Sequence, residues 1–231
     1  SGALFYLERK SKIMKQGTFE DVKDRIIYVL ENAAAAEKDG RPIPHEDYLD
    51  MIKTFRVCRH DRDYDFNVTW DDLKKWGVGL EAVVESANRN SPVLNPPMIY
   101  QVACTISGVQ PITIGDSMDE ILENMADIED VTFPMYMLTN VSEQYGACSI
   151  LNESLLGQIA DLWEDDIVLL PSSLHEFLMI PYSKSRMNLE EWQETVSTMN
   201  GMDFMEDSVL SDSVYRYDRK NQKVVIGYCP K

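Results

Sequence analysis

Two successive segments in the second half of the chain each predict a pair of strands followed by a helix, and this repeated order constrains the fold most. Runs of β-branched and apolar residues favour strands, whereas apolar residues spaced three to four apart favour helices. The order predicts an α+β fold, with an antiparallel sheet built from repeated β-hairpin and helix units and helices on one face. The predicted elements are strands at 135–139 and 147–151 with a helix at 153–163, then strands at 167–170 and 176–180 with a helix at 189–199.

The first half of the chain predicts a helical and hairpin subdomain. Thr18 followed by Asp21 has the pattern of a helix cap, and the apolar residues after it predict a helix at about 19–37. The remaining predicted elements are strands at 54–58 and 66–70, helices at 71–76 and 80–88, and a hairpin near the C-terminus made of 214–217 and 223–228.

Prolines mark the expected boundary between two subdomains. Pro96, Pro97 and Pro111 flank the apolar run 99–103, which predicts a linker or an edge strand because proline cannot donate to the ladder of a central strand. A helix with an acidic outer face is predicted next, at 116–127. The expected parts are an N-terminal tail or expression remnant at 1–17, an N-terminal α+β subdomain at 18–110 and a C-terminal α+β subdomain at 111–231.

The negative charge of the chain is concentrated in its middle. Between Arg89 and Lys184 there is no lysine or arginine, but there are 14 Asp and Glu residues, and they account for most of the net charge of −17. Such a charge can serve solubility alone, or it can attract a strongly basic partner in a salt-sensitive way. Candidate binding residues are Asp116, Asp119, Glu120, Glu123, Asp127, Glu129 and Asp130.

Composition disfavours several classes of protein. An acidic surface repels nucleic acids and anionic membranes, and the longest apolar runs are far shorter than the roughly 20 residues that span a bilayer. No cofactor motif is present, so no cofactor is expected. The four cysteines, Cys58, Cys104, Cys148 and Cys229, form no Cys-x-x-Cys pair. A chain of this size does not need disulfides, which favours reduced, buried thiols and a cytoplasmic protein.

Six segments of the chain carry a resemblance: MYMLTN (135–140), YGA (145–147), LPSSLHE (170–176) and LSDSVYRYD (210–218), with 22–28 and 76–78 in the first half. Together they resemble an uncharacterised family of bacterial proteins that is common in anaerobic Gram-positive gut species. The resemblance implies a fold unit and a bacterial or mobile-element source, but no activity, because the family is a domain of unknown function. Similar proteins usually begin with a further segment upstream, and their surfaces carry mixed charge, unlike the lysine-free middle of this chain.

The stretch 171–176 holds the candidates for catalysis. In an extended chain Ser173 and His175 share one side and Glu176 lies on the other, because side chains alternate along a strand. A serine nucleophile and a histidine base could meet there. A hydrolase would also need an orienting carboxylate and an oxyanion hole, for which Asp212 and Asn140 are the candidates. In the structural alternative, the serines end a strand and His175 lies in a half-buried turn.

The segment 61–72 imitates a calcium-binding loop, with oxygen-bearing side chains at its first, third, fifth, seventh, ninth and twelfth positions. Its sixth position is Phe66, where such loops need glycine, and an acidic hairpin turn is the simpler interpretation. The three adjacent acids at 164–166 are interpreted as a solvated loop. The candidate metal ligands are Asp61, Asp63, Asp65 and Asp72.

Three classes of function remain open from the sequence. The first, which needs the fewest assumptions, is a non-catalytic interaction or regulatory module whose acidic face binds a basic protein, including mimicry of a nucleic acid by a protein from a mobile element. The second is a hydrolase that uses Ser173 and His175. The third is a small-molecule or calcium-binding module.

Overall fold

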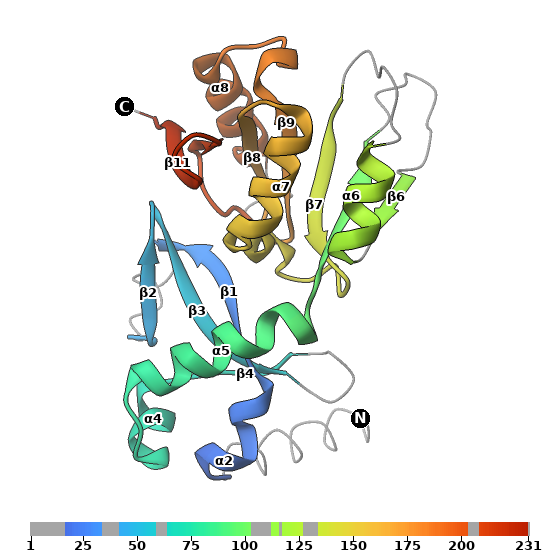
Figure 1. Ribbon diagram of the computed structural model, residues 1–231. Coiled ribbons are helices and arrows are strands. Elements are labelled where there is room, and N and C mark those ends of the chain that lie inside the picture. The colour runs from blue at the N-terminus through green and yellow to red at the C-terminus, as the bar shows by residue number, and fades with distance from the viewer. Residues whose placement is uncertain are drawn as a thin grey trace, which may run out of the picture. The chain divides into compact units, whose positions relative to one another are not determined.

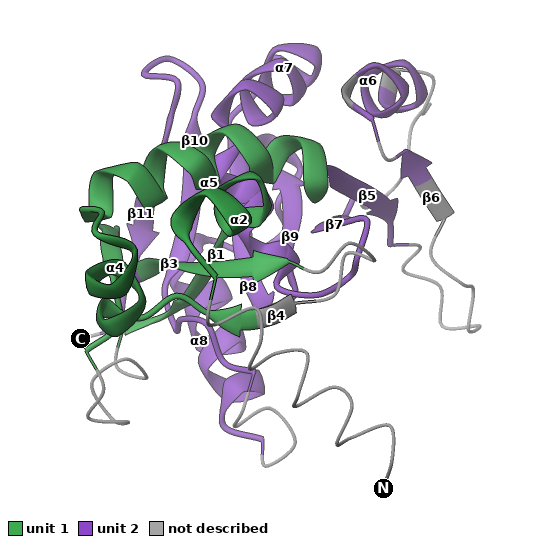
Figure 2. Cartoon of the chain, turned by 90° about the horizontal axis from the view of Figure 1, so that it is seen from below, with its two compact units in different colours: residues 1–48, 52–95 green, residues 49–51, 96–231 purple. Residues whose placement is uncertain are grey.

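The structure is a computed structural model, and it divides into two compact units (Figure 2). The N-terminal unit contains residues 1–48 and 52–95, and the C-terminal unit contains residues 49–51 and 96–231. The residues that the structure describes are 17–33, 42–58, 64–102, 112–115, 117–126, 134–202 and 208–230.

The N-terminal unit packs helices against a small sheet. Its elements are α2 (Phe19–Val22), the 3-10 turn η1 (Lys23–Arg25), β1 (Ile26–Asn32), β2 (His45–Tyr48), β3 (Met51–Cys58), β4 (Tyr64–Asn67), α4 (Trp70–Trp76) and α5 (Leu80–Leu94). Among the described residues the sheet has four strands, with β1, β3 and β2 in that order and β4 paired to β3. Ile26, Phe55, Leu73 and Val83 are buried in one apolar core that joins sheet and helices.

The helix predicted at 19–37 is wrong beyond its first turn. The predicted cap is present, since the backbone N–H of Thr18 donates to Oδ2 of Asp21 (2.7 Å). However, α2 ends at Val22, and β1 begins at Ile26. The first, second, fourth and fifth residues of β1 are buried, so both faces of the strand are covered. A short apolar run of this kind cannot be distinguished from a helix by its spacing.

The two longer helices of this unit end differently from each other. α4 is closed by Gly77, which has a left-handed conformation (φ 70°) that glycine adopts at no steric cost. α5 was expected to end near Asn88, but it continues to Leu94 with Pro92 inside it. The last turn is held by the backbone N–H of Asn95, which donates to the carbonyl of Ser91 (3.0 Å).

The C-terminal unit is built on one antiparallel sheet, which confirms the predicted α+β class (Figure 1). Its strands are β5 (Pro97–Gln101), β6 (Ile112–Gly115), β7 (Tyr136–Asn140), β8 (Ile167–Ser173), β9 (Glu176–Pro181), β10 (Val214–Asp218) and β11 (Lys223–Tyr228). Within the described part of the chain, their order in the sheet is β11-β10-β8-β9-β7-β5-β6. The helical elements are α6 (Met118–Ala126), η2 (Gly146–Leu151), α7 (Glu153–Trp163), η3 (Tyr182–Lys184) and α8 (Leu189–Asn200).

Helices cover both faces of this sheet, so the expectation of helices on one face is wrong. α8 packs on β8, β10 and β11, and its Trp192 shares a core with Val168 and Ile180. α7 lies on the other side, where the ring of Trp163 contacts the ring of Tyr136 (5.4 Å between centroids). Figure 2 shows the sheet between α7 and α8. The first five residues of β8 are all buried, as in a strand with both faces covered.

A pair of strands followed by a helix occurs at β5, β6 and α6 and again at β8, β9 and α8, so the first unit is not where it was predicted. Residues 146–151 form the 3-10 segment η2 and not a strand. The run predicted as a linker or edge strand is β5, which lies between β6 and β7 inside the sheet. Pro97 is tolerated there because it is the first residue of the strand. Residues 96–101 therefore belong to the C-terminal unit, and not to a subdomain ending at 110.

No helix among the described residues combines the length and the apolar character that crossing a bilayer requires. Cys58 and Cys148 are buried, as expected for core thiols, but Cys229 is exposed, so the expectation is wrong for that residue. Cys104 lies outside the described residues.

Candidate functional site

The C-terminal unit contains a cavity of about 380 Å³ between α8 and the turn end of the β8–β9 hairpin. We call it the α8 cavity. Its walls combine apolar side chains from the sheet and from α8 with a small polar group at the hairpin turn. The lining residues are Leu170, Pro171, Ser172, Ser173, His175, Glu176, Leu178, Trp192, Thr195, Val196, Met199, Asn200 and Ser208.

The polar group of the cavity is centred on Ser173, which is only 6% exposed. Its hydroxyl donates to Oε1 of Glu176 (2.9 Å) and accepts from the backbone N–H of His175 (2.9 Å). Ser173 and Glu176 are directly paired across the hairpin, and the register shifts between Pro171 and Ser173. Residues paired directly across two strands project on the same side. The expectation that Glu176 lies opposite Ser173 is therefore wrong.

His175 is held by a different part of the unit. Its Nδ1 accepts from the backbone N–H of Tyr145 (3.0 Å), and its ring lies 5.7 Å from the ring of Tyr145. Its carbonyl accepts from the hydroxyl of Thr139 (2.8 Å). An Nδ1 that accepts a hydrogen bond carries no proton, so the imidazole is neutral in this arrangement. His175 thus connects the hairpin turn to η2 and β7.

The candidates for the orienting carboxylate and the oxyanion hole have other partners. Asp212 is exposed, and its Oδ1 accepts from Nδ2 of Asn200 (2.8 Å) at the end of α8. Asn140 is buried and fastens the turn after β7, where its Nδ2 donates to the carbonyl of Gln144 (2.9 Å). Among the described residues, the side chains of Ser173, His175 and Asp212 form no hydrogen bond with one another. A triad needs nucleophile, base and orienter in one chain of hydrogen bonds, so this geometry offers serine catalysis no support.

The sequence alone did not indicate the wall of the cavity that α8 forms. Trp192 lines the cavity, and its Nε1 donates to Oγ of Ser185 (2.8 Å). Thr195, Val196 and Met199 line the cavity from the next turns of the helix. Their spacing places them on one face of the helix, and this spacing was the only indication of this wall in the sequence. Its partner on the sheet is distant in the sequence, and a stripe does not identify it.

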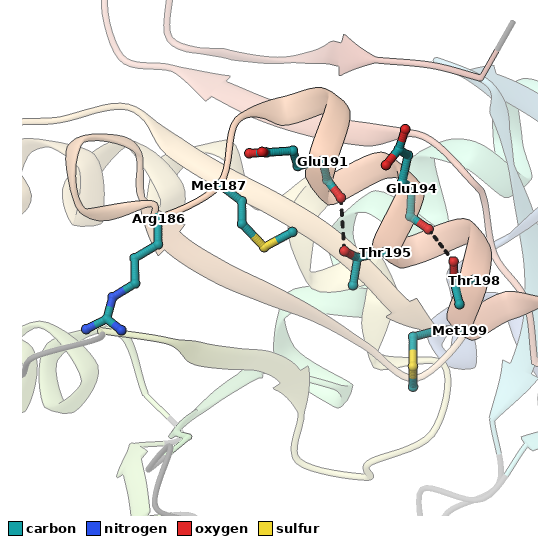
Figure 3. A pocket seen from close by; sticks show the side chains of 7 residues that line it. All are labelled: Arg186, Met187, Glu191, Glu194, Thr195, Thr198 and Met199. Atoms are coloured by element: carbon teal, nitrogen blue, oxygen red, sulfur yellow. Dashed lines mark hydrogen bonds between the residues drawn. The ribbon is translucent and has the colours of Figure 1, made fainter.

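A second, more open groove of about 430 Å³ lies along α8 (Figure 3). It shares Thr195 and Met199 with the α8 cavity. The hydroxyls of Thr195 and Thr198 donate to the helix carbonyls of Glu191 (2.9 Å) and Glu194 (2.7 Å). In Figure 3 the side chain of Arg186 lies at the opposite end of this groove from Met199. The groove is lined by Arg186, Met187, Glu191, Glu194, Thr195, Thr198 and Met199.

The candidate acidic residues are divided between described and undescribed parts of the chain. Asp119, Glu120 and Glu123 are exposed on α6. The other candidates, Asp116, Asp127, Glu129 and Asp130, lie outside the described residues.

Acids farther along the stretch without lysine or arginine are paired with arginines from β10 and the turn after it. Nε of Arg219 donates to Oδ1 of Asp161 (2.8 Å), and this bond raises the pKa of Arg219 above its ordinary value. Asp166 accepts from the backbone N–H of Arg219 (3.0 Å) and forms an ion pair with Arg216 (3.3 Å). Asp165 accepts from the backbone N–H of Ser183 (2.7 Å). Asp165 and Asp166, two of the three acids at 164–166, are thus bonded to other parts of the unit.

The structure describes two of the four candidate calcium ligands. Asp61 and Asp63 lie outside the described residues, and Asp65 belongs to β4. Asp72 caps α4, where its Oδ2 accepts from the backbone N–H (3.0 Å) and the hydroxyl (2.6 Å) of Thr69. In the part of the chain that the structure describes, no three His, Cys, Asp or Glu side chains lie together in a way that could hold a metal ion.

Comparison with known proteins gives one match. Residues 6–219 match the model of a family described as a family of unknown function, DUF5688. No curated protein and no solved structure matches the chain.

Proposed function

The chain belongs to the DUF5688 family of unknown function, and we propose that its C-terminal unit is a non-catalytic ligand-binding module whose α8 cavity takes a small amphipathic molecule. The observation that carries this proposal is a part-buried polar pair that lies beside an apolar wall in the same cavity. Ser173 and Glu176 form the pair, and Leu178, Trp192 and Val196 belong to the wall. Binding sites for small molecules have this composition, because apolar contact supplies affinity and a few polar groups fix the orientation.

The cavity is held in place without a ligand. Leu170 and Leu178 belong to paired strands of the sheet, and Trp192 is fixed by its hydrogen bond to Ser185. Glu176 is fixed by Ser173. A preformed site avoids the entropic cost of ordering side chains when the ligand binds. The rigid walls therefore support the interpretation of this cavity as a binding site and not as a packing defect.

A screen of small amphipathic molecules by thermal unfolding tests this proposal. A ligand at 100 times its dissociation constant is expected to add about 2.7 kcal/mol to the free energy of unfolding, or about 5–10 °C to the Tm of a protein of this size. Thr195→Trp places an indole at the cavity and is expected to remove most of this shift.

Thr198→Trp is the matched control. Thr198 is exposed on the same helix and its hydroxyl makes the same kind of bond, but it lines only the open groove. This variant is expected to keep the full shift. A shift that survives Thr195→Trp and disappears in Thr198→Trp would place the ligand in the groove, and a library without any hit would contradict the proposal.

The acidic α6 is a second candidate site, for a basic protein. Its exposed Asp119, Glu120 and Glu123 lie within the stretch that has no lysine or arginine. We expect the triple variant Asp119→Asn, Glu120→Gln, Glu123→Gln to lose a partner that wild type captures from host lysate and releases at moderate salt. Surface charges act mainly on the association rate and are screened by salt.

The control for this experiment carries the same change of charge in the other unit. Asp71, Glu81 and Glu85 are exposed on α4 and α5, and their neutralisation is expected to leave capture unchanged. Equal capture by wild type and both triple variants would remove the support for α6 as a binding face.

A further inference from the structure

The charged side chains around the α8 cavity are acidic. Among the described residues that line it, Glu176 is a carboxylate and none is lysine or arginine. His175 does not offset this charge, because its Nδ1 accepts a hydrogen bond and the ring is neutral. Asp212, bonded to the lining residue Asn200, adds a second carboxylate next to the cavity.

The origin of the asymmetry lies in the sequence. The hairpin wall, 170–178, comes from the stretch between Arg89 and Lys184, which contains no lysine or arginine. The wall from α8 (Leu189–Asn200) has no basic residue either. Arg186 lines the open groove, and Figure 3 places it at the end away from Met199, which the groove shares with the cavity.

The position of Glu176 suits an ionic contact. Its Oε1 is fixed by one hydrogen bond from Ser173, and a carboxylate has about four acceptor sites on its two oxygens. Leu178, Trp192 and Val196 lower the local polarity, and the attraction between opposite charges is stronger in such surroundings than in water. The same surroundings penalise an anionic ligand, because it would be repelled by a carboxylate that cannot be screened well.

We infer that the ligand of the α8 cavity is a cation with an apolar body, namely a protonated amine or a guanidinium whose head contacts Glu176 and whose hydrocarbon part lies against Trp192 and Val196. This inference rests on the proposed function, since it assumes that the cavity binds a ligand. It adds the chemical class of that ligand.

Three probes with the same hydrocarbon chain test the inference: hexylamine, hexan-1-ol and hexanoate at neutral pH. Binding is followed by NMR on the indole N–H signal of Trp192, one of four tryptophans in the chain. A hydrogen bond to a charged group contributes enough for at least about a tenfold difference in affinity, so hexylamine is expected to bind about tenfold or more tightly than hexan-1-ol. Hexanoate is expected to bind most weakly.

The variant Glu176→Gln assigns the preference to one carboxylate. Its amide oxygen can still accept from Ser173, and we expect hexylamine and hexan-1-ol to bind it within about threefold of each other, since the charge is gone. Glu194→Gln is the control and is expected to keep the wild-type preference, because Glu194 is exposed and lines the open groove but not the α8 cavity.

The outcomes separate the two proposals. Equal binding of hexylamine and hexan-1-ol to the wild-type protein, or tighter binding of hexanoate, would overturn the cationic class while the cavity remains a ligand site. If none of the three probes moves the Trp192 signal, the proposed function itself fails, and the inference fails with it. A preference for hexylamine that Glu176→Gln retains would overturn the role of Glu176.

Discussion

Replacing Gly146 by alanine is expected to lower the free energy of unfolding by about 3 kcal/mol, the upper end of the usual range for overpacking. A Cβ at this buried position would lie 2.2 Å from Oγ1 of Thr139, 2.4 Å from the carbonyl oxygen of His175 and 2.8 Å from the backbone nitrogen of Asn140. Two of these atoms are backbone, so a movement of the Thr139 side chain alone cannot relieve the clash. Denaturant unfolding of variant and wild type measures the loss.

Gly201→Ala is the matched control for this prediction. A Cβ on Gly201 would meet its nearest atom, the carbonyl oxygen of Ser197, at an ordinary 3.5 Å. The backbone there is right-handed helical, which alanine adopts readily, so the change is expected to be neutral or stabilising by less than about 1 kcal/mol. A loss at Gly201 as large as that at Gly146 would show that close packing is not the cause.

The clash at Gly146 also concerns the site. The carbonyl of His175 already accepts from Thr139, and the imidazole of His175 accepts from the residue that precedes Gly146. A larger residue at 146 must push the hairpin turn away from β7. The turn carries Ser173 and Glu176, so the variant is also expected to bind ligands of the α8 cavity more weakly.

Local signals in the sequence were sufficient for much of the fold. α7 and α8 have clear helical spacing, and β8 and β9 are short apolar runs joined by a short turn. Where prediction failed, tertiary contacts decided the structure. β1 is apolar on both faces because it is buried on both, and that removes the alternation by which strands are recognised. η2 has a strand-like composition but packs as a 3-10 segment beside β7 and β9.

The site was predictable only where it is contiguous. One short segment contains Ser173, His175 and Glu176, so the sequence is enough to propose that they lie near one another. Which of them share a side depends on the register shift after Pro171, and no periodicity encodes that shift. The α8 wall depends on the packing of a helix against a sheet face, which is set by both partners and not by either segment alone.

Phe177→Ala is expected to produce the largest loss of stability, about 3–5 kcal/mol, because it removes a ring from the core of the sheet. Phe177 is fully buried, and its ring lies edge-on to that of Tyr215 at 5.8 Å. It pairs with Leu138 on β7 and with Pro171 on β8, so strands on both sides of β9 border the space that alanine would leave. The central strands cannot close on such a cavity without breaking their ladder. Denaturant unfolding at one temperature measures the difference.

The neighbouring Leu178 supplies the decisive comparison, because adjacent residues of β9 face opposite sides of the sheet. Leu178 is half-buried and already borders the α8 cavity, so Leu178→Ala enlarges an existing space and is expected to cost less than half as much as Phe177→Ala. The same substitution is expected to change which chain length of alkylamine binds best, because it enlarges the apolar part of the cavity. If the two alanine variants lose equal stability, Leu178 does not border open space, and the cavity that underlies the proposed function is filled in solution.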